Sequence, residues 1–105
     1  MKSVNGFSNC PNLTNVTFGN SVSEIGTKAF VNCVSLKNID FPNSLTIIDN
    51  DAFRGCTNLT NIIFPDSLIY IGTSAFSGCH SLENIDLPNT LRYIINSAFY
   101  NCTEL

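Results

Sequence analysis

The sequence predicts a solenoid of short stacked coils, with a parallel sheet on one face and short strands and 3₁₀ or helical turns on the other. A 23-residue period appears when the chain is aligned against itself, and each period carries an alternating apolar stretch followed by turn-forming residues. The chain has 105 residues, of which 44% are hydrophobic and 12% are charged. This composition is typical of a single folded domain with a packed core.

Three columns of identical residues establish the period. They are the leucines Leu13, Leu36, Leu59, Leu82 and Leu105, the phenylalanines Phe7, Phe30, Phe53, Phe76 and Phe99, and the cysteines Cys10, Cys33, Cys56, Cys79 and Cys102. A unit of this size cannot bury its own apolar face, so neighbouring units must stack to form a shared core. We therefore expect these columns to point inward.

The period divides one domain, residues 1–105, into a partial repeat and four full ones. The partial repeat is 1–12, the full repeats are 13–35, 36–58, 59–81 and 82–104, and the next repeat starts at 105. Neither end carries the polar cap that solenoids need, which predicts a fragment of a longer array. A homo-oligomer formed through the uncapped ends is the alternative.

Each unit begins with the pattern Leu-x-x-Ile-x-Phe, which alternates as a short strand does. The strand is expected to stop at Pro42, Pro65 and Pro88, because proline cannot donate a ladder hydrogen bond. Asn or Asp and then Ser or Thr follow each proline, and this composition favours a turn whose side chains bond nearby backbone amides.

A second apolar stretch, such as residues 45–48, leads to a potential helix N-cap in each unit. These residues are Thr27, Asn50, Thr73 and Asn96. One helical or 3₁₀ turn is expected to follow and to carry the Ala-Phe pair, in which the small alanine permits close approach and the ring fills the space between units.

The unit Leu-x-x-Ile-x-Phe-Pro-x-Ser-Leu-x-x-Ile-Gly-x-x-Ala-Phe-x-Gly-Cys resembles the BspA-type leucine-rich repeats over nearly the whole chain. The resemblance implies a right-handed leucine-rich-repeat solenoid of the β-rich α/β class, with no catalytic residues and no cofactor. It also implies display on the cell surface and adhesion to a host matrix protein or to another microbe's surface protein. Residues 1–5 fit poorly, since Lys2 stands where later units have Ile25 and its equivalents.

The charge balance and the lack of a long apolar run argue against nucleic acid and membrane as partners. Five Lys and Arg against eight Asp and Glu leave a net charge of -3, so there is no basic field to bind nucleic acid. No apolar run approaches the ~18 residues that cross a bilayer, so we expect no membrane insertion by this segment. An intracellular scaffold or a structural spacer that uses the same surface is the alternative to adhesion.

The candidate partner-binding surface is the outward side of the first strand in each unit. Its residues are Asn15, Thr17, Asn38, Asp40, Asn61, Ile63, Asn84 and Asp86. The constant Asn column is equally consistent with a ladder that stabilises the stack, whereas the variable Thr, Asp, Ile, Asp column is typical of recognition. A second outward column, Glu24, Ile47, Tyr70 and Tyr93, favours cross-strand pairing over a docking stripe.

The remaining chemical groups predict structure rather than catalysis or metal binding. Five single cysteines without a Cys-x-x-Cys pair indicate a buried ladder of free thiols, since disulfides between parallel, in-register side chains are poorly oriented. His80 lies beside Cys79, but adjacent residues on a tight loop rarely face each other as a nucleophile and its base. Asp40 and Asp86, two strands apart, are expected to be solvated surface groups or binding contacts rather than a catalytic pair.

Overall fold

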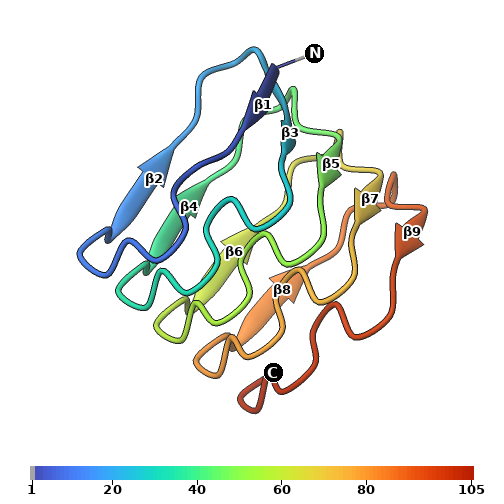
Figure 1. Ribbon diagram of the computed structural model, residues 1–105. Coiled ribbons are helices and arrows are strands. Elements are labelled where there is room, and N and C mark those ends of the chain that lie inside the picture. The colour runs from blue at the N-terminus through green and yellow to red at the C-terminus, as the bar shows by residue number, and fades with distance from the viewer. Residues whose placement is uncertain (1) are drawn as a thin grey trace.

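The computed structural model describes residues 2–105 and shows a solenoid whose coils stack side by side along one axis (Figure 1). Each full coil contributes one short strand to each of two sides, the partial first coil contributes only β1, and turns join the strands. The strands are β1 Lys2–Val4, β2 Asn15–Thr17, β3 Val22–Ile25, β4 Asn38–Asp40, β5 Ile47–Ile48, β6 Asn61–Ile63, β7 Tyr70–Ile71, β8 Asn84–Asp86 and β9 Tyr93–Ile94.

The side predicted to carry the parallel sheet contains β2, β4, β6 and β8. β2 pairs with β4 and β6 pairs with β8, both in parallel and both one 23-residue period apart, as in the pair Val16 and Ile39. The sheet is not continuous, because β4 and β6 pack together without joining the same hydrogen-bonded ladder. The expected four-stranded sheet is therefore two pairs of strands.

The opposite side, where the sequence predicted short strands, holds the longest sheet. Its order is β1-β3-β5-β7-β9 and all of its pairs are parallel. Val4, not Lys2, pairs with Ile25, with a register irregularity between Lys2 and Ser3. The expected mismatch at Lys2 was wrong, because the first coil reaches the phenylalanine column from Val4 with two residues fewer than the later coils.

The expected helical or 3₁₀ turns are single hydrogen-bonded turns, and no helix forms within residues 2–105. The Ala29 amide donates to the Gly26 carbonyl at 3.1 Å, which closes one turn. The third residue of that turn, Lys28, has a φ of 60°, and a left-handed residue cannot continue a right-handed helix. The N-cap interpretation of Thr27 and its equivalents was therefore wrong.

These turns form a third ladder of hydrogen bonds between coils. The Phe30 amide donates to the Ala52 carbonyl at 2.8 Å, and the Phe53 amide donates to the Ala75 carbonyl at 2.7 Å. Amides on this face bond forward to the next coil, so the turn backbone is satisfied without a helix.

The turns after the prolines close as expected, but their hydroxyls bond differently. The Leu45 amide donates to the Pro42 carbonyl at 3.1 Å, which closes one such turn. The Thr90 hydroxyl donates at 2.9 Å to the carbonyl of Leu68, 22 residues earlier, and Ser44 and Ser67 do the same one coil apart. These side chains join coils instead of bonding nearby amides.

The predicted inward columns form the core. The fully buried large side chains are Ile25, Phe30, Leu36, Leu45, Ile48, Phe53, Leu59, Leu68, Ile71, Phe76 and Leu82. Phe30 and Phe53 stack with ring centroids 5.2 Å apart and planes within 2° of parallel, and the same stack runs from Phe7 to Phe99. Aromatic contact along the axis therefore adds to the apolar burial of each coil.

The cysteines form the ladder of free thiols that the sequence predicted, with Cys33, Cys56 and Cys79 buried and Cys10 and Cys102 partly buried. Each thiol after the first donates to the phenylalanine carbonyl of the preceding coil, as Cys56 does to Phe30 at 3.2 Å. Burial, and secondarily repulsion from the neighbouring Cys33, raises the pKa of Cys56 to about 12. These thiols therefore act as hydrogen-bond donors in the core.

Candidate functional site

The sequence-predicted surface lies together on the outward side of β2, β4, β6 and β8. Every one of its eight residues is exposed: Asn15, Thr17, Asn38, Asp40, Asn61, Ile63, Asn84 and Asp86. The strands hold them there because the central residue of each strand points inward, as Ile62 does at 3% exposure. The surface is open and solvent-facing, with side chains spaced by the strand repeat.

The asparagine column is only partly a ladder. The Asn38 side-chain amide donates to the Asn15 side-chain oxygen at 3.0 Å. Among the described residues, Asn61 and Asn84 make no hydrogen bond to another side chain, and the interruption between β4 and β6 separates them from the first pair. The first two amides therefore stabilise the stack, while no such side-chain bond joins Asn61 to Asn84.

Ile63 is the unusual residue on this surface. Its side chain is 82% exposed, far more than any other large apolar residue in residues 2–105. A shallow hollow of about 390 Å³ lies beside it and is lined by Ile39, Asp40, Phe41, Asn43, Ile63, Phe64, Pro65 and Asp66. One apolar side chain thus stands between carboxylates, next to a depression that could receive a partner's side chain.

The second outward column lines a groove on the opposite side, over β3, β5, β7 and β9. Tyr70 and Tyr93 lie on neighbouring strands with ring centroids 6.2 Å apart. This contact is the cross-strand pairing that the sequence favoured. The pairing does not cover the stripe, because Tyr93 is 55% exposed.

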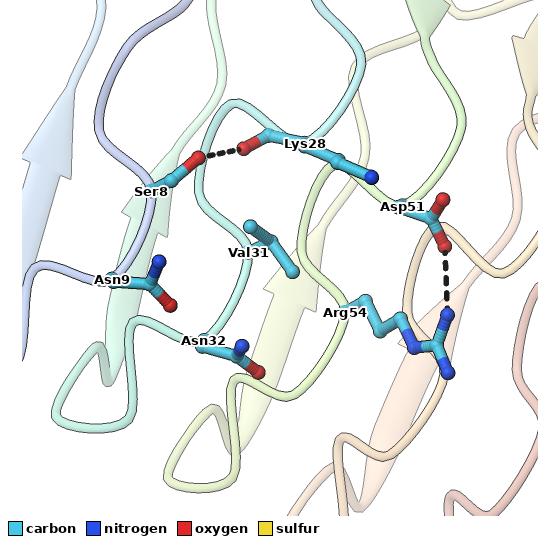
Figure 2. Close-up of a pocket in the computed structure, with 7 residues that line it drawn as sticks. All are labelled: Ser8, Asn9, Lys28, Val31, Asn32, Asp51 and Arg54. Atoms are coloured by element: carbon cyan, nitrogen blue, oxygen red, sulfur yellow. Dashed lines mark hydrogen bonds and ion pairs between the residues drawn. The ribbon is translucent and has the colours of Figure 1, made fainter.

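A third hollow, of about 540 Å³, lies over the turn ladder and was missed by sequence reasoning (Figure 2). It is lined by Ser8, Asn9, Lys28, Val31, Asn32, Asp51 and Arg54. Arg54 contacts Asp51 at 3.5 Å, an exposed pair that stabilises little. Lys28 and Arg54 belong to the turns of two neighbouring coils. They line one hollow only because the coils stack in register.

The structure separates the groups considered for nucleophilic chemistry. Cys79 is completely buried and donates to the Phe53 carbonyl at 3.3 Å, whereas His80 is exposed. Within the part of the chain that the structure describes, no three His, Cys, Asp or Glu residues are grouped as metal ligands. A separate finding is that residues 2–105 contain no helix long and apolar enough to cross a bilayer.

The coil geometry agrees with a known family. The model of the BspA type leucine rich repeat region (6 copies) matches residues 3–105. The chain belongs to the BspA-type leucine-rich-repeat family. A comparison with curated proteins finds no match.

Solved structures share the BspA-type architecture over nearly all of this chain. A leucine-rich repeat protein of T. pallidum is 39% identical, with a TM-score of 0.95 over 99% of this chain. A leucine-rich cell surface protein of Faecalibacterium prausnitzii is 38% identical, with a TM-score of 0.90 over 99%. A leucine-rich repeat protein of Bacteroides ovatus is 33% identical, with a TM-score of 0.87 over 98%.

This BspA-type chain spans only part of those proteins. It covers 49% of the T. pallidum chain, 29% of the B. ovatus chain and 27% of the F. prausnitzii chain. Family membership makes the chain a protein-interaction repeat module, since such solenoids generally serve as binding scaffolds rather than enzymes.

Proposed function

We propose that this chain is an adhesion module displayed on the cell surface, and that it binds a host matrix protein or another microbe's surface protein. The binding surface is the outward side of β2, β4, β6 and β8. The observation that carries this proposal is the 82% exposure of Ile63 in the column that also holds Asp40 and Asp86. Covering this apolar side chain with a partner would remove it from water, which favours binding.

The rigidity of this surface supports a binding role. Each strand is held by parallel pairing and by a central residue that packs on the core, buried in β4 and β6 and partly buried in β2 and β8. The outward side chains are therefore already positioned before a partner arrives. Preorganisation reduces the entropy lost on binding. The F. prausnitzii relative is a cell surface protein, which supports display of this chain outside the cell.

The test is surface plasmon resonance of the purified chain against a panel of host matrix proteins. The site variant carries Asp40→Lys, Ile63→Lys and Asp86→Lys, and we expect it to lose the binding that the wild type shows. The control variant carries Thr73→Lys, Glu83→Lys and Glu104→Lys. These are exposed residues outside the proposed surface, and the control changes the net charge by the same amount.

Three results would separate the alternatives. Loss of binding in the site variant alone supports recognition by the strand surface. Equal loss in both variants points to a general charge effect and contradicts the proposed surface. No binding to any panel member by the wild type favours the structural spacer. Antibody staining of intact, unpermeabilised cells tests display at the surface, and staining seen only after permeabilisation favours the intracellular scaffold.

A further inference from the structure

A groove lies on the outward side of β3, β5, β7 and β9. Figure 1 shows these strands on a different side of the solenoid from β2, β4, β6 and β8, which carry the proposed adhesion surface. The groove has a volume of about 450 Å³ and is lined by Glu24, Thr46, Ile47, Asp49, Ile69, Tyr70 and Tyr93. Parallel pairing places Glu24, Ile47, Tyr70 and Tyr93 on successive strands. One end of the groove is therefore acidic and the other aromatic.

The acidic end carries two carboxyl groups without a cation. The hydrogen bond between the Glu24 and Asp49 side chains raises the pKa of Glu24, and burial and repulsion from Asp49 add to the effect. No Lys or Arg lines the groove, and the one ion pair within residues 2–105 joins Arg54 to Asp51 elsewhere. A positive group placed here would relieve the repulsion between the two carboxyls.

The aromatic end belongs to the same groove as those carboxyls. Tyr70 pairs with Ile47 in the strand register, and Asp49, two residues beyond Ile47, lines the groove together with Tyr70. The Tyr70 and Tyr93 rings are tilted by 53° relative to each other, so they do not stack face to face.

We propose that this groove binds an arginine side chain presented by a partner protein. The guanidinium ion would donate hydrogen bonds to the Glu24 and Asp49 carboxylates while its flat face stacks on Tyr70. Arginine fits better than lysine, because a planar, weakly hydrated cation can use the ring and the carboxylates together. The exposed Ile69 and Tyr93 provide apolar contact for the neighbouring part of the partner.

The adhesion proposal does not depend on this groove, since the two surfaces lie on opposite sides of the solenoid. A negative arginine titration would contradict the groove proposal and not the adhesion proposal. The variant carrying Asp40→Lys, Ile63→Lys and Asp86→Lys tests adhesion alone, because it changes no residue of the groove. A partner that used both surfaces would bind around the edge of the coils.

The experiment is a titration of the ¹⁵N-labelled chain with N-acetyl-arginine amide, followed by amide chemical shifts in NMR spectra. We expect saturable shifts confined to the residues that line the groove. N-acetyl-citrulline amide has nearly the same shape without the charge, and it should bind about tenfold more weakly or less, because charge-assisted hydrogen bonds are lost. The affinity for N-acetyl-lysine amide should lie between those for the arginine and citrulline amides.

Two variants test the assignment of the groove residues. The double variant Glu24→Gln, Asp49→Asn should abolish the arginine-specific shifts, and Tyr70→Leu should weaken them while keeping an apolar side chain. The matched control, Asp66→Asn with Glu83→Gln, should titrate as the wild type does. The NMR spectra report at the same time that each variant is folded.

Three results would overturn the inference. Citrulline amide could bind as tightly as arginine amide, the double acidic variant could bind as the wild type does, or the shifts could be spread over carboxylates elsewhere, such as Asp40 and Asp86. Each would show that the groove does not recognise the guanidinium ion.

Discussion

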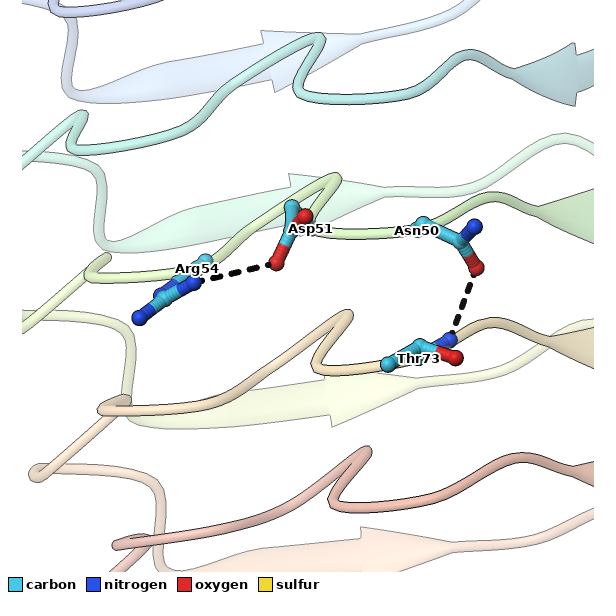
Figure 3. A network of polar contacts seen from close by, with 4 residues as sticks. All are labelled: Asn50, Asp51, Arg54 and Thr73. Carbon is cyan, nitrogen blue, oxygen red and sulfur yellow. Dashed lines mark hydrogen bonds and ion pairs between the residues drawn. The ribbon is translucent and has the colours of Figure 1, made fainter.

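The side-chain oxygen of Asn50 accepts a hydrogen bond of 2.8 Å from the backbone amide of Thr73 in the next coil (Figure 3). This contact requires glycine at the neighbouring position, because a Cβ at Gly72 would lie 2.5 Å from that oxygen. A side-chain amide from one coil thus occupies the space that a missing side chain leaves in the next. The same relationship joins Asn5 to Gly26.

Substituting this glycine should destabilise the fold. A Cβ at Gly72 would also lie 2.7 Å from the Asn50 backbone nitrogen, which cannot move aside as a flexible side chain could. We expect Gly72→Ala to lower the free energy of unfolding by about 1–3 kcal/mol, the usual cost of overpacking. Urea unfolding followed by circular dichroism measures it.

Gly19→Ala is the matched control, since a Cβ there would meet nothing within 4 Å. It should be neutral or slightly stabilising, by up to about 1 kcal/mol, through the unfolded chain. Removing the Asn50 side chain should rescue Gly72→Ala only in part, because the backbone contact remains. Equal stability of the two glycine variants would contradict this account of Gly72.

The stacked phenylalanines should differ in how much they contribute to the free energy of unfolding, according to how many neighbouring rings they contact. Phe53 is completely buried and stacks on rings in both adjacent coils, whereas Phe7 is 44% exposed and stacks only on Phe30 among the described residues. We expect Phe53→Ala to cost about 3–5 kcal/mol of unfolding free energy and Phe7→Ala less than about 2 kcal/mol. Chemical denaturation of the two variants checks this, and similar losses would mean that the coils do not share one core.

The period determined most of the fold in advance. One column of identical residues, such as Cys33, Cys56 and Cys79, fixes the coil length and therefore the register of every parallel pair except the first, β1 with β3. Alternation then separates inward Ile62 from outward Ile63 with no other information. This is why the exposed candidate surface could be named residue by residue.

The turns could not be read from the same pattern. Thr27 and Asn50 are good helix N-caps by composition, but the following residue, Lys28 or Asp51, adopts a left-handed conformation. That conformation is stabilised by hydrogen bonds to the next coil, as from the Lys28 backbone amide to the Asn50 carbonyl at 3.0 Å. These are contacts between coils, which the local sequence does not specify. Local preference was overridden by stacking.

The groove also depended on tertiary contact. The sequence placed Glu24 and Tyr70 in one column, but Asp49 belongs to another, and its approach to Glu24 follows from the diagonal geometry of adjacent strands. Equivalent positions in aligned repeats do not indicate which side chains are diagonal neighbours on adjacent strands.

Glu24 should make stability depend on pH. Its pKa is raised in the folded state above its ordinary value of 4.5, chiefly by the hydrogen bond with Asp49. The folded chain therefore binds this proton more tightly, and the free energy of unfolding falls as the pH rises from 4.5 through the raised value. Above that window the cost of holding two charged carboxyls together is fully present.

Glu24→Gln removes that cost, so the variant should be more stable than the wild type at about pH 7 and equal to it at about pH 3.5. The gain should be small, because the side chain is half-buried and water screens the charges. Thermal unfolding across this pH range measures the difference, with Glu83→Gln as the exposed control. A variant that is less stable at neutral pH would mean that Glu24 is stabilised by a contact other than Asp49.

The cysteine ladder should react from its ends. Burial raises the pKa of Cys56 to about 12, and burial together with repulsion from Cys56 and Cys102 raises the pKa of Cys79 as well. Almost none of either thiol is ionised at about pH 8, and alkylation requires the thiolate. Cys10 is only partly buried, and its contact with the Ser8 carbonyl is long, at 3.8 Å.

We therefore expect iodoacetamide to modify Cys10 first, while Cys56 and Cys79 react only as fast as the chain unfolds. Mass spectrometry of proteolytic fragments at several times of labelling gives the order, and labelling in denaturant provides the control in which all five should react alike. Rapid modification of Cys56 under native conditions would show that the coils open locally, and the thiol ladder would then be an exposed reactive site instead of part of the core.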